Sequence, residues 1–268
     1  MSAPILPARR WSKSPSQHLD ARVKLVLALA FILTTALVPQ AAWAVYLLLF
    51  SLVTSALILS ELAPGRIYLR SLIALPFAFA ALPLIFTLPG QAWFSMNLGQ
   101  IHLTATTTGA VRALSILIKV WLSVQAGILL SATTPQTALL AAMRALKLPR
   151  LLVSVMGLMW RYLDLLLGEA RRLMRARDSR SASSPSGSRR AGGSLVWRAR
   201  VTGGMAGSLM LRSLERSERV YQAMLARGYD GEPREARHQT LTSRDRLVLS
   251  IGLLILFAMN LLAMLWIL

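Results

Sequence analysis

The stretch VKLVLALAFILTTALVPQAAWAVYLLLFSLVTSALILS (Val23–Ser60) decides the fold class of this chain. It holds two apolar runs, Val23–Val38 and Ala41–Ser60, with only Pro39 and Gln40 between them. At 1.5 Å of rise per residue, each run is about long enough to cross the hydrocarbon core of a bilayer as a helix. The stretch therefore predicts two membrane-spanning helices joined by a tight turn.

Three more apolar blocks follow. They are LIALPFAFAALPLIFTL (Leu72–Leu88), GAVRALSILIKVWLSVQAGILLSA (Gly109–Ala132) and LVLSIGLLILFAMNLLAMLWIL (Leu247–Leu268). The whole chain is 55% hydrophobic, and its charged residues lie mostly between the blocks. This pattern is typical of a polytopic membrane protein and not of a soluble or disordered chain. We expect an all-α fold with about five transmembrane helices.

The distribution of Lys and Arg predicts the orientation of these spans. Residues 1–22 are polar and basic and lack the features of a cleaved signal peptide, so we expect them to remain on the cytoplasmic side. Arg66 and Arg70 follow the second span and belong on the same side, whereas Pro89–Thr108 contains no Lys or Arg and belongs outside. We therefore expect a multi-pass protein of the cytoplasmic membrane, with its N-terminus inside and its C-terminus outside.

The segment Leu151–Leu167 is a further candidate span. Its longest uncharged run, Leu151–Trp160, has ten residues, and a crossing here would export most of the remaining arginines. Between Arg161 and Arg246 the sequence holds eighteen Arg, no Lys and nine acidic residues. Both the short run and the positive charge oppose a crossing. We predict a cytoplasmic helical region instead, with its apolar faces buried in protein or lying at the membrane surface.

Two long amphipathic helices are predicted within this cytoplasmic region. The first begins near Pro149, carries apolar residues at three- and four-residue spacing, and ends by Arg180. The sequence SRSASSPSGSRRAGGS then favours a flexible linker. The second helix runs from roughly Met205 to Arg227, and Gly228 is well placed as a left-handed cap at its C-terminal end.

These elements predict four regions along the chain. Residues 1–22 form an N-terminal cytoplasmic segment, 23–132 a four-span membrane domain, 133–246 the cytoplasmic domain with its linker at 181–194, and 247–268 the final transmembrane helix. The cytoplasmic domain opens with a shorter interfacial helix at Pro135–Leu148.

Residue types for metal or acid-base chemistry are scarce. The chain has no Cys, its three His are scattered, and Glu61 is the only acidic residue between Ala21 and Trp160. Intramembrane enzymes that rely on carboxylates, and most ion-coupled carriers, need acidic residues in their spans. No nucleotide-binding lysine motif or glycine-rich phosphate loop occurs. We expect no catalytic residue, no cofactor-binding residue and no metal ligand in this chain.

Basic residues raise two further questions. The net charge of +19 is explained by Lys and Arg retained on the cytoplasmic side and by anionic lipid headgroups, so we expect the bilayer and no nucleic acid as a partner. Inside the fourth block, Lys119 lies deep and finds no carboxylate in the spans. It is a candidate functional residue within the membrane, facing a polar interior or a partner subunit.

Each long cytoplasmic helix ends near a small residue followed by arginine: Ala176-Arg177-Asp178 in the first and Ala226-Arg227-Gly228 in the second. One interpretation is docking, because alanine lets a partner backbone come close and arginine offers a planar fork to carboxylates or helix-end carbonyls. The other is local, with Gly228 as a cap and Arg227 at the negative end of the helix dipole. The residues alone leave both open.

The sequence RSLERSERVYQAMLARGYDG (Arg212–Gly231), preceded by RYLDLLLGEARRLMRARDSR (Arg161–Arg180), resembles the transmembrane T component of energy-coupling-factor transporters. The form of the second motif is similar to the CbiQ/NikQ branch for cobalt and nickel. The resemblance extends from the first span to the last. It implies cobalt uptake, with nickel or a vitamin as alternative cargo. The rival hypothesis, from another class of protein, is a stand-alone membrane carrier or channel.

The resemblance also implies a division of labour among subunits. Two cytoplasmic ABC ATPase subunits (CbiO-like) would bind ATP and Mg, and a membrane substrate-binding subunit (CbiM-like, with an accessory CbiN-like protein) would bind the metal ion. This non-catalytic chain would couple them by docking the ATPases through Ala226, Arg227 and Gly228. The first motif matches at Ala176 and Arg177, but Asp178 stands where the family often has glycine.

Overall fold

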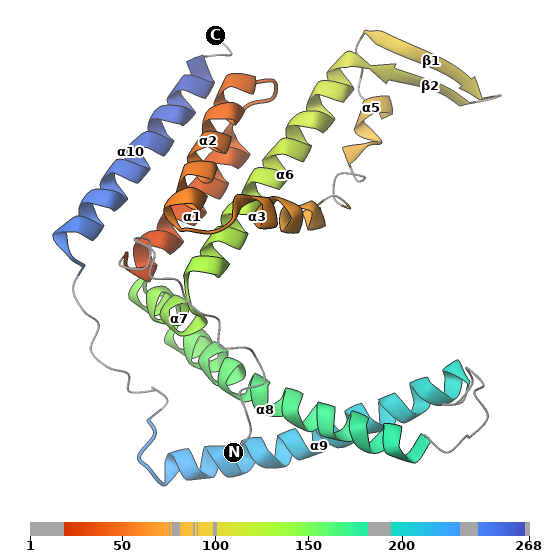
Figure 1. Cartoon of the computed structure of the whole chain (residues 1–268), viewed down its shortest axis with the longest axis vertical. Helices are drawn as coiled ribbons and strands as arrows, with labels where there is room; N and C mark the ends of the chain where they lie inside the picture. Colours follow the sequence, from red (N-terminus) through yellow and green to blue (C-terminus); the bar gives the residue numbers. More distant parts are fainter. Residues whose placement is uncertain are drawn as a thin grey trace. The chain divides into compact units, whose positions relative to one another are not determined.

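The computed structural model (Figure 1) describes residues 19–74, 76, 81–87, 89, 91–98, 101–181, 194–230 and 241–265. The described residues fall into two compact units. The larger unit, called the membrane unit here, takes its residues from 10–146 and 238–268, and the smaller, the two-helix unit, takes its residues from 147–237.

The membrane unit contains most of the secondary structure. Its elements are α1 (Ala21–Leu37), α2 (Trp43–Leu59), α3 (Pro64–Ser71), the 3₁₀ helix η2 (Leu72–Ala74), α5 (Leu84–Thr87), β1 (Ala92–Leu98), β2 (Ile101–Thr106), α6 (Thr107–Thr133), α7 (Gln136–Ala145) and α10 (Ser243–Leu265). The helical, polytopic architecture is confirmed, and α1, α2, α6, α7 and α10 lie close to their predicted ranges.

The helices α1, α2, α6 and α10 pack around one apolar core. Its buried side chains include Phe31, Val45, Leu49, Val53, Leu57, Leu122 and Leu256. Large apolar side chains on the outer faces, such as Leu33, Leu47 and Phe257, are more than half exposed. A bundle that is apolar on its outside as well as its inside suits lipid as the surrounding solvent.

Three described helices are long and apolar enough to cross a membrane: Thr107–Thr133, Arg150–Arg180 and Ser243–Leu265. The helix Trp43–Leu59 is apolar but shorter. The presence of Arg150–Arg180 among the three shows that length and hydropathy alone do not separate this helix from the spans. Its placement in the cytoplasm therefore stays a prediction that rests on the positive charge around it.

The prediction of one helix over Leu72–Leu88 is wrong. The chain follows α3 into the 3₁₀ turn η2, makes a further turn at Leu82 and Pro83, and then forms the single turn of α5. Proline has no backbone N–H and clashes with the preceding helical turn, so Pro76 and Pro83 interrupt a straight helix here. Residues 75, 77–80 and 88 lie outside the described part of this block.

A β-hairpin follows, which the sequence did not predict. Strands β1 and β2 pair in an antiparallel register from Ala92 opposite Thr106 to Leu98 opposite Ile101, with an irregularity between Ala92 and Phe94. The second strand leads directly into α6, where the Thr106 hydroxyl accepts a hydrogen bond from the Gly109 amide at 3.2 Å and caps the helix. The hairpin therefore ends at the start of the longest helix of the membrane unit.

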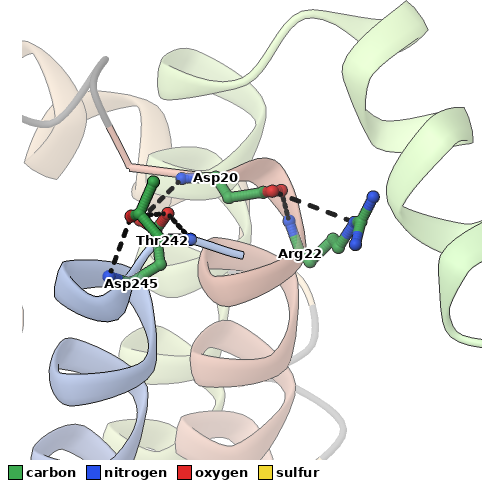
Figure 2. Close-up of polar contacts among 4 residues, drawn as sticks. All are labelled: Asp20, Arg22, Thr242 and Asp245. Carbon is green, nitrogen blue, oxygen red and sulfur yellow. Dashed lines mark hydrogen bonds and ion pairs between the residues drawn. The ribbon is translucent and has the colours of Figure 1, made fainter. Parts of the chain in front are cut away.

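The first turns of α1 and α10 meet in a polar cluster (Figure 2). Thr242 and Asp245 form a capping box at the start of α10: the Thr242 hydroxyl accepts from the Asp245 amide at 3.3 Å, and the Thr242 amide donates to the Asp245 carboxylate at 3.3 Å. Asp245 also accepts from the backbone amide of Asp20, whose own carboxylate accepts from the Arg22 amide at 2.9 Å. Further along, Gly252 of α10 lies against Leu27 of α1, so α1 and α10 run in the same direction.

The long helix α6 runs opposite to α1. Lys24, in the first turns of α1, donates to the carbonyl oxygen of Thr133 at the end of α6, at 3.2 Å. At the other end, the backbone amide of Ala41, which follows α1, donates to the hydroxyl of Ser115 near the start of α6 at 3.3 Å. The relative directions of α1, α6 and α10 agree with the predicted order of spans.

The two-helix unit consists of α8 (Arg150–Ser181) and α9 (Leu195–Leu225). α8 matches its prediction, but α9 begins ten residues earlier than predicted, where the Ser194 hydroxyl caps the helix by accepting from the Trp197 amide at 3.2 Å. This start is hard to recognise in the sequence, because glycine is a poor helix former and three glycines follow it: Gly203, Gly204 and Gly207. Residues 182–193 of the predicted linker lie outside the described residues.

Candidate functional site

The C-terminal end of α9 carries the second Ala-Arg motif and is fixed by its own backbone. Gly228 has a φ of +75°, the left-handed conformation that glycine adopts without strain. The Gly228 amide donates to the Leu225 carbonyl at 2.9 Å, and the Tyr229 amide donates to the Met224 carbonyl at 3.0 Å. These two bonds define a Schellman motif, so the predicted capping role of Gly228 is confirmed.

Arg227 is exposed on the side of this capped end. Together with Gly228 and Tyr229 it lines a cavity of about 450 Å³, whose other wall includes Leu158 and Arg161 of α8. An ideal Cβ on Gly228 would meet nothing within 4 Å, so the space around the cap is open. The motif therefore presents a guanidinium at a rigid, accessible helix end, which suits a contact with carboxylates or helix-end carbonyls.

The two helices of this unit run in opposite directions. Arg216 of α9 pairs with Glu169 of α8, and their side chains are 32% and 20% exposed. A second cavity, of about 690 Å³, lies between the helices and is lined mainly by apolar side chains such as Leu158, Leu166 and Met224. No side chain described in α9 is fully buried, so much of its surface is free for contacts outside the unit.

The first Ala-Arg motif has a different geometry. α8 continues through Asp178 to Ser181, so Ala176 and Arg177 lie inside the last turns of the helix and not at a left-handed cap. The Nε and Nη2 atoms of Arg177 donate to Oδ1 of Asp178 at 3.1 and 2.8 Å. Gly228 terminates α9. At the corresponding position of the first motif, Asp178 continues α8 and accepts hydrogen bonds from Arg177.

The structure does not bring Arg177 and Arg227 together. Arg227 lies against the part of α8 that includes Arg161, sixteen residues before Arg177. Sixteen residues of α-helix measure about 24 Å. The two motifs therefore lie at opposite ends of the two-helix unit.

Lys119 lies in the membrane unit and binds backbone oxygens. Its ammonium donates to the Ala36 carbonyl at 3.1 Å and also to the Val38 carbonyl. Both oxygens belong to the C-terminal end of α1, where the last carbonyls of a helix have no partner within the helix and Pro39 offers no N–H. The described contacts of Lys119 are thus with the end of α1, and any functional role beyond them stays a prediction.

The pKa of one carboxyl outside the predicted spans is displaced. The hydrogen bond from the Thr242 hydroxyl holds the pKa of Asp245 below its usual range, and the backbone amides of Asp20 and Thr242 add to this effect. Burial acts in the opposite direction, since Asp245 is only 5% exposed, but the hydrogen bonds outweigh it. Asp245 is therefore a structural carboxylate that is stable in its charged form.

Two features of the site escaped the sequence reasoning. The Glu169–Arg216 pair joins helices whose register was unknown, and only the prediction that both helices belong to one region pointed to such a pair. Tyr229 completes the Schellman motif, and the aromatic residue directly after Gly228 was an available signal for it. Among the described residues, no group of three or more His, Cys, Asp or Glu side chains is placed to hold a metal ion.

Comparisons with known proteins give a consistent result. The family model CbiQ, described as "Cobalt transport protein", matches residues 12–239. The cobalt transport protein CbiQ of Rhodobacter capsulatus is 26% identical over 225 residues, which cover 84% of this chain and 82% of that protein. An uncharacterised protein of Methanocaldococcus jannaschii is 26% identical over 219 residues, covering 81% and 77%. A protein of Methanocorpusculum labreanum, provisionally described as a fused cobalt transport protein CbiMQ, is 28% identical over 254 residues, covering 90% of this chain and 40% of the fusion.

Proposed function

The chain belongs to the CbiQ family of cobalt transport proteins, and from this premise we propose that it is the transmembrane coupling (T) component of an energy-coupling-factor transporter for cobalt. Membership in the family makes it a membrane component of cobalt transport. The coupling role goes further. It assigns ATP hydrolysis to two cytoplasmic ATPase subunits and metal binding to a separate membrane subunit.

The observation that carries the proposal is the capped end of α9. A Schellman motif fixes the direction in which Arg227 leaves the helix, and the surrounding space is open. Such an end is preorganised for insertion into a groove on a partner, because little conformational freedom is lost on binding. Arg177, about 24 Å away along α8, offers a second and weaker contact. Two separated contacts suit a dimer of ATPases better than a single small partner.

The name of the fused relative supports the membrane partner. A protein described as CbiMQ joins a CbiQ-like part to another cobalt transport part in one chain. We therefore propose a CbiM-like subunit, with an accessory CbiN-like protein, as the neighbour that holds the metal ion. On this view ATP and Mg bind in the ATPases, and the present chain binds neither cofactor nor cargo.

The predicted topology gives the side on which docking would take place. We propose that residues 1–22 and the two-helix unit lie in the cytoplasm and that the C-terminus lies outside. The parallel directions of α1 and α10 support this arrangement, since an odd number of crossings requires the first and last spans to run the same way. The coupling step would then be a change in the crossing of α8 and α9 as the ATPases close and open.

Charge reversal tests the proposal. Arg227→Glu should abolish co-purification of the ATPase subunits from solubilised membranes, and Arg177→Glu should weaken it, while both variants remain in the membrane. Arg200→Glu is the matched control, because Arg200 is an exposed arginine of α9 outside both motifs. Full ATPase recovery and full cobalt uptake in the Arg177→Glu/Arg227→Glu double variant would overturn the proposed docking role.

A further inference from the structure

Two adjoining cavities lie at the end of the membrane unit where α1 begins. The smaller, of about 280 Å³, is lined by Lys24 of α1, by Thr133 and Thr134 at the end of α6, and by Pro135 and Ala138 at the start of α7. The larger, of about 470 Å³, extends between α1, α2, α6 and α10. The cavities share Leu19, Lys24 and Thr133 in their walls, so they adjoin at these residues and have two different linings.

The wall of the smaller cavity includes the hydrogen-bond donors Lys24 and Thr134. Lys24 uses one of its three ammonium protons on the Thr133 carbonyl. Thr134 is only 4% exposed, and its hydroxyl finds no hydrogen-bond partner among the residues that the structure describes. A buried hydroxyl without a partner is costly in a folded protein, which points to a group that is bound here in the membrane.

The start of α7 adds backbone donors. Pro135 occupies the cap position and gives no side-chain hydrogen bond to the helix. The first amide that finds a helical acceptor is that of Leu139, which donates to the Pro135 carbonyl at 3.0 Å. The amides before it point out of the helix end beside Ala138, where they favour an anion. A lysine, a hydroxyl and free helix amides around one cavity match the several acceptor oxygens of a phosphate.

Nearby carboxylates do not block an anion at this position. Asp20, four residues before Lys24, accepts from the Arg22 amide and lies 3.8 Å from the Arg22 guanidinium. Asp245 is occupied by Thr242 and by the Asp20 amide, as Figure 2 shows. Both negative charges are thus engaged by donors of their own.

The larger cavity decides between a free phosphate and a lipid. Apart from Lys24, Ser60 and Thr133, its walls are apolar, with Leu27, Phe31, Ala56, Leu129 and Leu256 among them. A free anion gains nothing from such a space, whereas an acyl chain does. We propose that the two adjoining cavities bind one anionic glycerophospholipid, with its phosphate held by Lys24, Thr134 and the start of α7, and one acyl chain between α1, α2, α6 and α10.

The test compares three probes on the purified full chain in neutral detergent: phosphatidylglycerol, phosphatidylcholine and inorganic phosphate. Native mass spectrometry counts bound lipid, and thermal unfolding reports stabilisation. Phosphatidylglycerol should bind one molecule per chain and raise the unfolding midpoint more than the other two probes. Lys24→Gln should weaken its binding about fivefold, the effect of one lysine near a lipid surface. Ala56→Leu, which fills the apolar cavity, should weaken it with the charges intact.

Lys147→Gln is the matched control, because Lys147 is an exposed lysine outside both cavities. If Lys24→Gln fails to fold, Thr134→Val removes a single donor at nearly constant volume, and Lys24→Arg keeps the charge. Equal binding of phosphatidylglycerol by the wild-type chain and by the Lys24→Gln or Thr134→Val variants would overturn the proposed headgroup site. Stabilisation by inorganic phosphate equal to that by phosphatidylglycerol, and unchanged in Ala56→Leu, would show a free-anion site and overturn the lipid assignment.

Discussion

The backbone amide of Asp20 donates a hydrogen bond to Oδ1 of Asp245 across 3.3 Å, and so joins the first turns of two helices that lie 225 residues apart in the chain. Asp245 closes the capping box of α10 through Thr242 at the same time (Figure 2). One carboxylate therefore caps α10 and aligns it with α1, the first and last helices of the membrane unit.

Removal of the Asp245 carboxylate should weaken the contact between the first turns of α1 and α10. We expect Asp245→Ala to lower the free energy of unfolding by about 1–2 kcal/mol, because a helix cap and an inter-helix hydrogen bond are lost together. The thermal unfolding midpoint in detergent measures the loss. Asp164→Ala, at an exposed position of α8, serves as the control and should change little.

The pH dependence of this contact between α1 and α10 follows from the lowered pKa of Asp245. The folded-state pKa of Asp245 is lowered, so the carboxylate contributes stability that is present above the unfolded-state value of about 4 and is lost as the pH falls through the lower folded value. Below about pH 4 the wild-type chain should therefore lose this part of its advantage over Asp245→Asn. A constant difference between the two proteins from pH 7 to pH 3 would contradict the assignment.

Gly228→Ala should weaken docking without disturbing the membrane unit. Alanine at a φ of +75° costs about 1–2 kcal/mol, and no neighbouring atom would clash with the added methyl group. The end of α9 should rearrange, and ATPase affinity should fall several-fold. Gly228→Asn should be milder, since asparagine tolerates the left-handed conformation. Equal affinities of the wild-type, alanine and asparagine proteins would mean that the cap does not present Arg227.

Two glycines at helix contacts should respond differently to alanine. At Gly109 the new Cβ would lie 2.6 Å from the Leu84 carbonyl oxygen and 2.8 Å from the Ile85 Cα, both backbone atoms that cannot move cheaply. At Gly252 it would lie 2.5 Å from Leu27 Cδ2, the tip of a flexible side chain. We expect Gly109→Ala to destabilise the chain by about 1–3 kcal/mol and Gly252→Ala by less than about 1 kcal/mol. Unfolding midpoints of the two variants check this order, which the reverse ranking would contradict.

Lys119→Met separates a structural role from a transport role. The variant leaves the Ala36 and Val38 carbonyls without their donor, so we expect stability to fall by about 1–3 kcal/mol. Cobalt uptake, divided by the amount of folded protein, should remain unchanged. A loss of uptake in a variant with wild-type stability would instead show that Lys119 acts in transport.

The sequence predicted best what local rules determine. Pro149 marked the start of α8, and Gly228 marked the end of α9, because proline and glycine have conformations that no neighbour needs to impose. The start of α9 at Ser194 was not predicted, because three glycines between residues 203 and 207 are weak helix formers and made a helix over this part of the sequence hard to recognise. The prediction of one helix over Leu72–Leu88 failed for the opposite reason: apolar composition favoured a continuous helix, whereas the described residues have a 3₁₀ turn at Leu72–Ala74 and a further turn at Leu82 and Pro83.

Contacts between distant segments were beyond sequence reasoning. The carbonyl partners of Lys119 at the end of α1 could not be named from the sequence, because only the packing of α6 on α1 brings them within reach. The two Ala-Arg motifs differ in the sequence at one position, where the first has Asp178 and the second has Gly228. In the structure one lies at a capped helix end and the other inside a helix with its arginine engaged by Asp178.

The central claim is that the end of α9 docks an ATPase, and site-specific crosslinking tests it most directly. The chain has no cysteine, so Ala226→Cys provides a unique thiol for a short photoreactive label in membranes that contain the whole transporter. Ala199→Cys, near the other end of α9, is the control. The account predicts a crosslink from position 226 to an ATPase subunit, identified by mass spectrometry, and none from position 199. A position-226 product that contains lipid or another membrane subunit, with no ATPase, would contradict it.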